Sequence, residues 1–367
     1  MRGYNEVLTP GVEYYDVFGI PGVSIPQQEM YKTTDNNGRL IVFRPDSTLP
    51  IARMASARLQ NFQKPVRLFY RQNVYRNTPD HTGVSNEAAQ MGIEILGAQG
   101  LRADLEAIML AADTLTKTIG DFRLEIGNAV FFQNLVGKLQ ISEERREQLR
   151  TTIESKNYAA LSGLLENIQD QKIVEAIRKL PRLFGGEEIF KEAERYCPDG
   201  DTADMLLYMK TLYRHLSETA LKDRIIVDLG LVQRNDYYTG IIFSAYTQEY
   251  GAAVLNGGRY DTLLGKFGDS MPAIGFSVDT DALTAIVRRR GGGESRIRKK
   301  TIVHIMPGYE IKAHRVMDEM VGKGRYCEAS VFDAVDKTRR YASVVGIHRL
   351  MVVGESVTEM ELGDDET

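Results

Sequence analysis

The chain has 367 residues, 43% apolar and 26% charged, a composition typical of a globular protein with two or three domains. Its net charge of −4 argues against a general nucleic-acid binder, which needs clustered Lys and Arg. Two distant cysteines, Cys197 and Cys327, predict neither a disulfide framework nor a metal site and favour a reducing compartment. Without a signal peptide or an apolar run of about 18 residues, we expect a cytoplasmic protein with no membrane association.

The first part of the chain, residues 1–130, alternates short apolar segments with turns. Segments 39–44, 67–71 and 93–97 are rich in branched and aromatic residues, which predicts strands. Residues 101–118 predict a helix, because apolar residues recur at spacings of three and four. Strand-rich stretches without a regular strand–helix alternation predict an α+β fold on an antiparallel sheet.

Residues 131–222 change character and predict a helical insertion, with one helix opening at Ser142 as its cap. The elements expected after it are two strands, a glycine-rich stretch and a closing helix: 225–228, 240–244, 251–275 and 279–290. We therefore expect one domain over residues 1–290 that contains the insertion.

A second, smaller domain is expected at 301–367, after a basic and glycine-rich segment at 291–300. That segment is typical of a solvated linker, with a residual RNA-binding patch as the alternative. In the small domain, strands alternate with helices, which predicts a mostly parallel sheet with right-handed crossovers. The expected strands are 301–306, 329–332 and 349–354, and the acidic end at 363–367 is expected to fray.

Polar clusters interrupt the apolar strands at three places. In the first, Asp46 and Thr48 follow a strand and offer a carboxylate and a hydroxyl, good partners for an ammonium group. The alternative is that Asp46 caps a helix beginning near Leu49, and the residues alone favour this alternative.

The second cluster holds Arg76, Gln90 and Glu94. Gln90 and Glu94 are four apart, which in a strand puts them on one face. Arg76 suits a carboxylate or phosphate, with a surface ion pair as the alternative. The third cluster comprises 235–240, with Tyr237 and Tyr238, and 256–261. Its tyrosines suit a core with bonded hydroxyls, and its glycines mark either a turn or the close approach of a ligand.

Signatures for nucleotide phosphates or activated nucleophiles are missing. The sequence has no Gly-x-x-x-x-Gly-Lys-Ser/Thr, no strand-linked Gly-x-Gly-x-x-Gly and no Gly-x-Ser-x-Gly. The five histidines are scattered, and none is singled out as a catalytic base. We expect no cofactor and no metal.

In order and spacing, the polar clusters resemble the catalytic domain of histidyl-tRNA synthetase, a class II aminoacyl-tRNA synthetase. The similar segments, from the end of motif 1 through motif 2 to motif 3, are 3–10, 70–78, 228–243, 255–263 and 272–283. The resemblance implies a class II synthetase-like antiparallel sheet, a helical insertion and a C-terminal α/β unit like the anticodon-binding domain. Motif 1 implies a homodimer, and its incomplete start predicts further N-terminal residues.

Three positions depart from the synthetase pattern. Thr78 replaces the motif 2 Glu that holds adenine, Ala282 stands at the motif 3 Arg, and Gln233 stands at the catalytic Arg, with Arg234 displaced by one. Adenylate transfer needs fixed cations around the developing phosphate charge, so these departures imply a chain with no synthetase activity.

The amino-acid pocket is largely kept, and the resemblance carries histidine-binding roles to seven residues: Asp46, Thr48, Arg76, Gln90, Glu94, Tyr237 and Tyr238. By resemblance, the first two and Gln90 would hold the ammonium group. Arg76 would lie near the carboxylate. Glu94 and the tyrosine pair would bind the imidazole.

Retained histidine recognition without ATP chemistry resembles the regulatory-subunit family of ATP phosphoribosyltransferase, and residues 44–53 are also similar to it. This implies a non-catalytic subunit that joins a short-form catalytic subunit in a hetero-oligomer for the first step of histidine biosynthesis. It would activate that partner and mediate feedback inhibition by histidine, its effector. One alternative is a diverged histidyl-tRNA synthetase that aminoacylates tRNA with ATP. The other is a binding protein with a different partner, such as a relative that senses uncharged tRNA.

Overall fold

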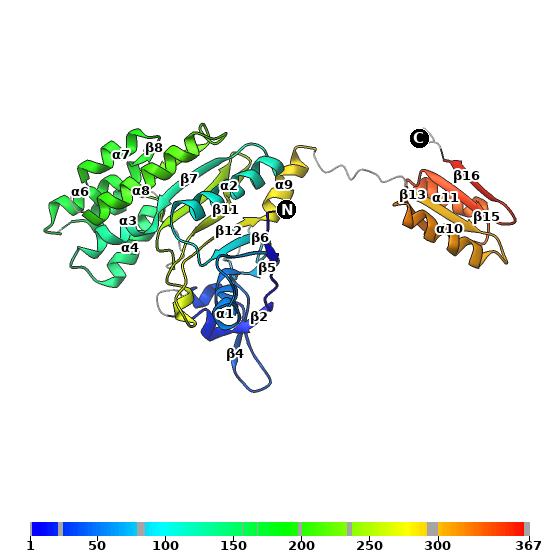
Figure 1. The fold of residues 1–367 in the computed structure, drawn as a ribbon, viewed down its shortest axis with the longest axis horizontal. Helices are drawn as coiled ribbons and strands as arrows, with labels where there is room; N and C mark the ends of the chain where they lie inside the picture. Colours follow the sequence, from blue (N-terminus) through cyan, green and yellow to red (C-terminus); the bar gives the residue numbers. More distant parts are fainter. Residues whose placement is uncertain are drawn as a thin grey trace. The chain divides into compact units, whose positions relative to one another are not determined.

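The computed structural model describes residues 2–20, 25–78, 85–155, 157–166, 168–196, 200–232, 237–291 and 300–362. The chain divides into two compact units, Met1–Arg289 and Arg290–Thr367 (Figure 1). Within the described residues, no helix is long and apolar enough to cross a membrane.

A large, mainly antiparallel sheet forms the framework of the first unit. Its strands in the described part, in spatial order, are β1 (Asn5–Glu6), β5 (Val66–Tyr75), β6 (Glu87–Leu96), β12 (Ala273–Asp279), β11 (Tyr250–Arg259), β10 (Ile241–Thr247), β7 (Arg123–Asn128), β9 (Ile225–Asp228) and β8 (Phe184–Gly185). Neighbours from β5 to β7 pair antiparallel, whereas β1 with β5 and β7 with β9 pair parallel. The predicted α+β fold on an antiparallel sheet is confirmed.

Five of these strands escaped the sequence-based prediction, among them the two-residue strands β1 and β8. β7 was not expected, and β11 and β12 cross the stretch from 251 to 275 that its glycines marked only as glycine-rich. Glycine lowers strand propensity, so this pattern favours a loop. The structure gives another reason for two of the glycines: a Cβ at Gly257 or Gly258 would lie within about 2.5 Å of the ring of Phe243 or Tyr238.

Smaller elements flank the sheet at the N-terminal end. β2 (Val12–Tyr14), β4 (Leu40–Phe43) and β3 (Lys32–Thr34) form a second antiparallel sheet, and α1 (Thr48–Arg58) follows β4. The predicted strand at 39–44 is thereby confirmed.

Two long helices of the first unit match the predicted ranges. α2 (Leu101–Thr118) begins and ends where the apolar spacing predicts, and its buried stripe includes Ala107, Ile108 and Leu115. α9 (Thr280–Arg289) closes the unit.

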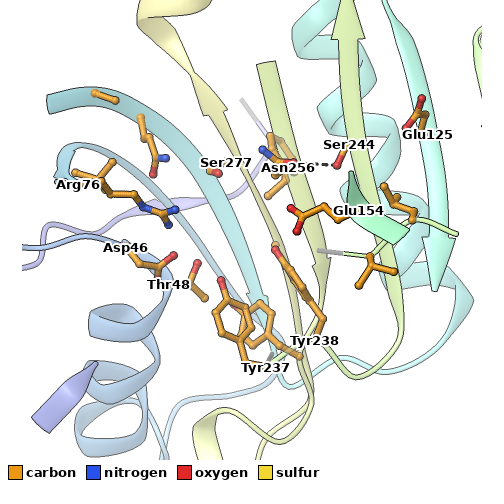
Figure 2. A pocket seen from close by; sticks show the side chains of 18 of the residues that line it. Asp46, Thr48, Arg76, Glu125, Glu154, Tyr237, Tyr238, Ser244, Asn256 and Ser277 are labelled. Atoms are coloured by element: carbon orange, nitrogen blue, oxygen red, sulfur yellow. Dashed lines mark hydrogen bonds between the residues drawn. The ribbon is translucent and has the colours of Figure 1, made fainter. Parts of the chain in front are cut away.

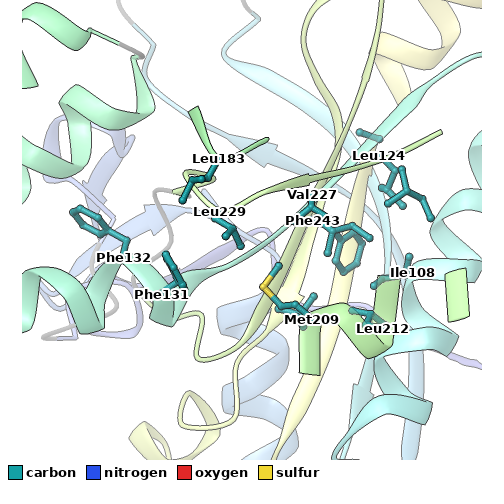
Figure 3. Packing of buried hydrophobic residues seen from close by; sticks show 14 of the residues in the cluster. Ile108, Leu124, Phe131, Phe132, Leu183, Met209, Leu212, Val227, Leu229 and Phe243 are labelled. Atoms are coloured by element: carbon teal, nitrogen blue, oxygen red, sulfur yellow. The ribbon is translucent and has the colours of Figure 1, made fainter. Parts of the chain in front are cut away.

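Helices fill the chain between β7 and β9. In the described residues they are α3 (Ala129–Gly137), α4 (Glu143–Glu154), α5 (Tyr158–Leu164), α6 (Gln171–Lys179), α7 (Glu188–Ala193) and α8 (Gly200–Ser217). Ser142 caps α4 as predicted, since its hydroxyl accepts a 3.3 Å hydrogen bond from the amide of Arg145. These helices share one hydrophobic core with the sheet and α2: Phe131 and Met209 from the helices and Leu124 and Phe243 from the sheet belong to the same cluster of buried residues (Figure 3).

The second unit is a small α/β layer. Its strands within the described range run in the order β14 (Tyr326–Ala329), β13 (Lys300–Ile305), β15 (Arg349–Val353) and β16 (Val357–Glu361). The first three pair in parallel as predicted, and β16 adds an antiparallel edge. Its helices are α10 (Glu310–Gly322) and α11 (Val335–Val344). The strand expected at 329–332 instead ends at Ala329, and the apolar Val331 that misled the prediction is 90% exposed.

Candidate functional site

One cavity of about 590 Å³ in the first unit is lined by all seven residues selected from the sequence (Figure 2). They reach it from the segment before α1, from α1 itself, from just past β5, from β6 and from the segment before β10: Asp46, Thr48, Arg76, Gln90, Glu94, Tyr237 and Tyr238. The fold therefore brings together residues that are up to about two hundred positions apart in the chain.

Asp46 both caps a helix and lines the cavity. Its Oδ1 accepts a 2.9 Å hydrogen bond from the amide of Leu49 in the first turn of α1. Burial raises the pKa of the Asp46 carboxyl. Backbone hydrogen bonds, the charge of Arg76 and a hydrogen bond with Tyr237 lower this pKa, but burial has the largest effect. A capping role and a ligand-binding role for Asp46 are compatible, because its carboxylate has a second oxygen that can meet a ligand.

Arg76 lines the same cavity, and its guanidinium points toward Asp46 (Figure 2). Its Nε donates a 3.0 Å hydrogen bond to the carbonyl of Pro45, which fixes the base of the guanidinium. Among the described residues, its Nη groups make no further hydrogen bond, so the outer edge of the guanidinium can meet a carboxylate as a fork. Gln90 lines the same cavity from β6.

Glu94 is the most deeply buried acid of the cavity, with 1% of its surface exposed. Its Oε1 accepts a 2.9 Å hydrogen bond from the hydroxyl of Thr48, and its Oε2 accepts one from the hydroxyl of Tyr260. Burial raises the pKa of Glu94 to about 8. The negative charge of Asp46 also raises it, whereas the two hydrogen bonds lower it. At neutral pH the carboxyl is therefore mostly protonated, although it lies among polar groups.

The space for Glu94 exists because β12 carries a glycine opposite it. Gly275 pairs with Glu94 across the ladder, and a Cβ at Gly275 would lie 1.7 Å from Oε2 of Glu94. A Cβ at Gly92 would lie 2.4 Å from the hydroxyl of Tyr70, which also lines the cavity. These glycines are part of how the sequence shapes the cavity.

Tyrosine rings form the apolar wall of the cavity. The ring centroid of Tyr237 lies 4.9 Å from that of Tyr238 and 5.8 Å from that of Tyr260. All three are buried, and burial raises the pKa of Tyr237 and Tyr260 well above their usual value, so their hydroxyls remain hydrogen-bond donors. Sequence reasoning did not select Tyr260, although it lies in the Gly-Gly-Arg-Tyr-Asp run that carried the resemblance.

The far end of the cavity carries three acidic residues that were not selected as site residues. Glu125, Glu154 and Asp228 line it from β7, α4 and β9. Glu154 pairs with Arg150 at 3.2 Å, and Asp228 accepts a 2.8 Å hydrogen bond from the amide of Gly230. Asp228 opens the segment 228–243 that carries part of the resemblance, whereas nothing in the local sequence marks Glu125 and Glu154, because they meet only in the folded sheet and insertion.

The positions that depart from the synthetase pattern have different surroundings. Thr78 lines the cavity and directs its amide and hydroxyl to Oδ1 of Asn86, at 3.1 and 2.5 Å. Ala282 is buried in α9 and does not line the cavity. Gln233 and Arg234 lie outside the described residues.

Comparison with known proteins identifies the family and the fold. A family model described as histidyl-tRNA synthetase matches residues 1–283. The ATP phosphoribosyltransferase regulatory subunit of Bacillus mycoides is 36% identical over 98% of this chain and 85% of its own length. The protein of the same name from Clostridium botulinum is 35% identical over 94% of this chain and 83% of its own length.

Solved structures show the same fold. One, described as an ATP phosphoribosyltransferase regulatory subunit/histidyl-tRNA synthetase from Bacillus halodurans, has a TM-score of 0.79 and 28% identity, covering 92% of this chain and 88% of that one. A histidyl-tRNA synthetase from a Nostoc species has a TM-score of 0.74 at 18% identity over 98% of this chain and 89% of that one, which supports the fold alone. The chain belongs to the family of ATP phosphoribosyltransferase regulatory subunits, whose fold is that of histidyl-tRNA synthetase.

Proposed function

We propose that this chain binds free histidine in the cavity and reports its concentration to a short-form ATP phosphoribosyltransferase catalytic subunit, which it also activates. The observation that carries the proposal is the pairing, in one cavity, of an Asp46–Arg76 end with a Glu94–tyrosine end. The first end suits the ammonium and carboxylate of an amino acid, and the second suits a flat ring with an N–H donor.

The ammonium group of histidine would meet Asp46, Thr48 and Gln90. Burial raises the pKa of Asp46, so a cation placed beside it would restore the charged form and gain an ion pair. The carboxylate would take the Nη groups of Arg76. Both ends of the zwitterion would then be neutralised within the protein, as burial of charge requires.

The imidazole would lie against Tyr237 and Tyr238 with a ring N–H donated to Glu94. Hydroxyls already hold the Glu94 carboxyl in place, so little side-chain entropy is lost on binding. Because Glu94 is mostly protonated near neutral pH, an imidazole N–H would favour its carboxylate form. We therefore expect histidine binding to be linked to a proton.

Absence of synthetase chemistry is part of the proposal. Thr78 donates its amide and hydroxyl to Asn86, whereas the synthetase pattern has a Glu that binds adenine at this position. Ala282 places a buried methyl group where the synthetase pattern has a cation. Loss of one electrostatic donor typically costs a catalytic step about 2.7–4 kcal/mol.

A homodimer is proposed through the N-terminal segment from Tyr4 to Pro10. Leu8 within it is 78% exposed, and the small sheet beside it exposes Val12, Tyr14 and Phe43 by 40–42% each. Exposed large apolar side chains in and near this segment are compatible with a subunit interface. This core dimer would then join the catalytic subunits in a larger hetero-oligomer.

Co-expression with a short-form catalytic subunit tests the partnership directly. We expect the two chains to co-purify in a defined ratio and the catalytic subunit to be more active in the complex than alone. Separate elution of the two chains, with no effect on activity, would refute the regulatory role. The diverged-synthetase alternative predicts instead that the chain alone activates histidine.

A further inference from the structure

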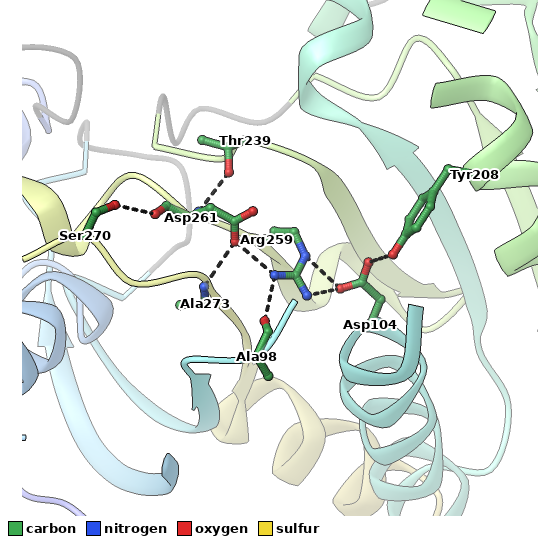
Figure 4. A network of polar contacts seen from close by, with 8 residues as sticks. All are labelled: Ala98, Asp104, Tyr208, Thr239, Arg259, Asp261, Ser270 and Ala273. Atoms are coloured by element: carbon green, nitrogen blue, oxygen red, sulfur yellow. Dashed lines mark hydrogen bonds and ion pairs between the residues drawn. The ribbon is translucent and has the colours of Figure 1, made fainter. Parts of the chain in front are cut away.

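Arg259, the last residue of β11, is the centre of a buried polar network (Figure 4). Its Nε and Nη2 donate to Oδ1 of Asp104 at 2.9 and 2.5 Å, and its Nη1 donates to Oδ1 of Asp261 at 2.9 Å and to the carbonyl of Ala98 at 3.1 Å. The side chains of Arg259 and Asp104 are 8% and 0% exposed. In so buried a network, losing one partner leaves a charge without compensation.

On one side, this network holds the chain segments that carry the cavity's tyrosines. Tyr260 follows Arg259 directly and donates its hydroxyl to Glu94. Thr239 directly follows the pair Tyr237 and Tyr238. Its amide donates to the carbonyl of Arg259 and its hydroxyl accepts from the amide of Asp261, both at 2.8 Å. A shift of Arg259 would therefore move the segments that carry Tyr238 and Tyr260.

On the other side, the network reaches the helical insertion. Oδ2 of Asp104 accepts a 2.5 Å hydrogen bond from the hydroxyl of Tyr208, which lies on α8. Burial, and then the hydrogen bond with Asp104, raises the pKa of Tyr208 above its usual range, so the hydroxyl keeps its proton. The carboxylate of Asp104 therefore links two parts of the unit. Its Oδ1 accepts from Arg259 of the sheet, and its Oδ2 accepts from Tyr208 of the insertion.

We propose that Tyr208 is a positioning residue through which the helical insertion and the cavity are energetically coupled. The path runs from Tyr208 through Asp104 to Arg259, and from there along the backbone to Tyr260 and Glu94. The inference rests on the proposed binding of histidine in this cavity. Tyr208 and Arg259 donate to the same buried carboxylate, so a change in one of these hydrogen bonds alters the position and charge that the other depends on. Coupling is reciprocal. Histidine bound at Glu94 therefore stabilises the contact between Tyr208 of α8 and Asp104, and displacement of α8 lowers the affinity for histidine.

The test compares Tyr208→Phe, which removes one hydroxyl and keeps the ring, with Tyr213→Phe as the matched control. Tyr213 lies on the same helix, is also half-buried and packs its ring against Phe190 at 5.9 Å. Calorimetry gives histidine affinity, and hydrogen exchange of peptides from α8 and β6 is measured with and without histidine. Tyr208→Phe should weaken histidine binding roughly two- to thirtyfold, the range for residues that couple without touching the ligand. It should also abolish the histidine-dependent protection of α8, whereas Tyr213→Phe should keep wild-type behaviour.

A purely structural role for Tyr208 gives a different pattern. Exchange of α8 would rise in Tyr208→Phe with and without ligand alike, and the histidine-dependent difference would remain, which overturns the coupling. So does a wild-type protein in which histidine protects β6 and leaves α8 unchanged. A wild-type protein that binds no histidine at all refutes the proposed function, and the coupling with it. This outcome is recognised because histidine then protects neither β6 nor α8 from hydrogen exchange.

Discussion

Thr48 and Glu94 lie 46 positions apart in the chain, and the hydroxyl of Thr48 donates a 2.9 Å hydrogen bond to Oε1 of Glu94. This bond ties the start of α1, which Asp46 caps, to the C-terminal half of β6. Tyr260 holds the other oxygen of Glu94. Hydroxyl donors rotate freely about their C–O bonds, so the carboxyl is fixed in place while its protonation state remains free to change. The predictions about Glu94 depend on this arrangement.

Replacement of Glu94 by Gln should weaken histidine binding about ten- to a hundredfold. The amide keeps the shape of the side chain but loses the charge-assisted bond to the imidazole N–H, worth about 1.5–3 kcal/mol. Glu94→Ala should weaken binding at least as much, and it also leaves the hydroxyls of Thr48 and Tyr260 without their acceptor. Calorimetric titration measures the change. Glu87→Gln, at the exposed start of the same strand, is the control and should bind like the wild type. Equal affinity in Glu94→Gln and wild type would refute the pocket assignment.

The stability of the protein should depend on pH through Glu94. Its pKa rises from 4.5 to about 8 on folding, so the folded state holds this proton more tightly than the unfolded chain. The corresponding stabilisation is complete below about pH 4.5 and is lost as the pH rises through about 8. The side chain of Glu94→Gln does not titrate. The free energy of unfolding of this variant relative to wild type should therefore increase from pH 5 to pH 9. The increase should be a few kcal/mol at most, because one pKa unit corresponds to about 1.4 kcal/mol. Urea unfolding of both proteins across this range measures the difference. A constant difference would show that the carboxyl titrates normally.

The purified chain should form no histidyl-adenylate. Thr78 and Ala282 stand where the synthetase pattern has an adenine contact and a phosphate-binding cation. Each missing electrostatic donor costs about 2.7–4 kcal/mol, which together remove most of the rate enhancement. Histidine-dependent exchange of pyrophosphate into ATP is the measurement, with an authentic histidyl-tRNA synthetase as positive control. Exchange well above the level without protein would support the diverged-synthetase alternative.

Leu8→Glu should dissociate the homodimer. Leu8 is 78% exposed in the segment proposed to lie at the twofold interface, and burying a glutamate carboxylate there would cost far more than leaving it in water. Light scattering at micromolar concentration should show a dimer for the wild type and a monomer for the variant. Leu207→Glu, at a 64% exposed position of α8, should remain dimeric. A monomeric wild type would contradict the proposed interface.

Much of the fold could be read from the sequence where local pattern and burial agree. α2 is amphipathic and isolated from competing signals, so its residues 101–118 follow from spacing alone. β11 and β12 could not be recognised, because their glycines make room for Phe243, Tyr238 and Glu94 from other segments. Such a reason becomes visible only when the neighbouring strands are in place.

The site divides in the same way. Gln90 and Glu94 share a face of β6, as a strand spacing of four requires, and both line the cavity. Tyr260 escaped selection because its contact with Glu94 joins residues 166 positions apart. Asp104 escaped because an aspartate in the first turn of a helix is ordinary in sequence, whereas here it is fully buried and bound by Arg259.

The most direct test of the account is a histidine titration of the reconstituted complex with a short-form catalytic subunit, read as the rate of phosphoribosyl-ATP formation. With wild-type chain, the rate should exceed that of the catalytic subunit alone and should fall as histidine is added. With Glu94→Gln, the rate without histidine should be unchanged, and inhibition should move to about ten- to a hundredfold higher histidine. A complex whose rate does not respond to histidine, or a Glu94→Gln complex inhibited at wild-type concentrations, would contradict the claim that this cavity is the sensor.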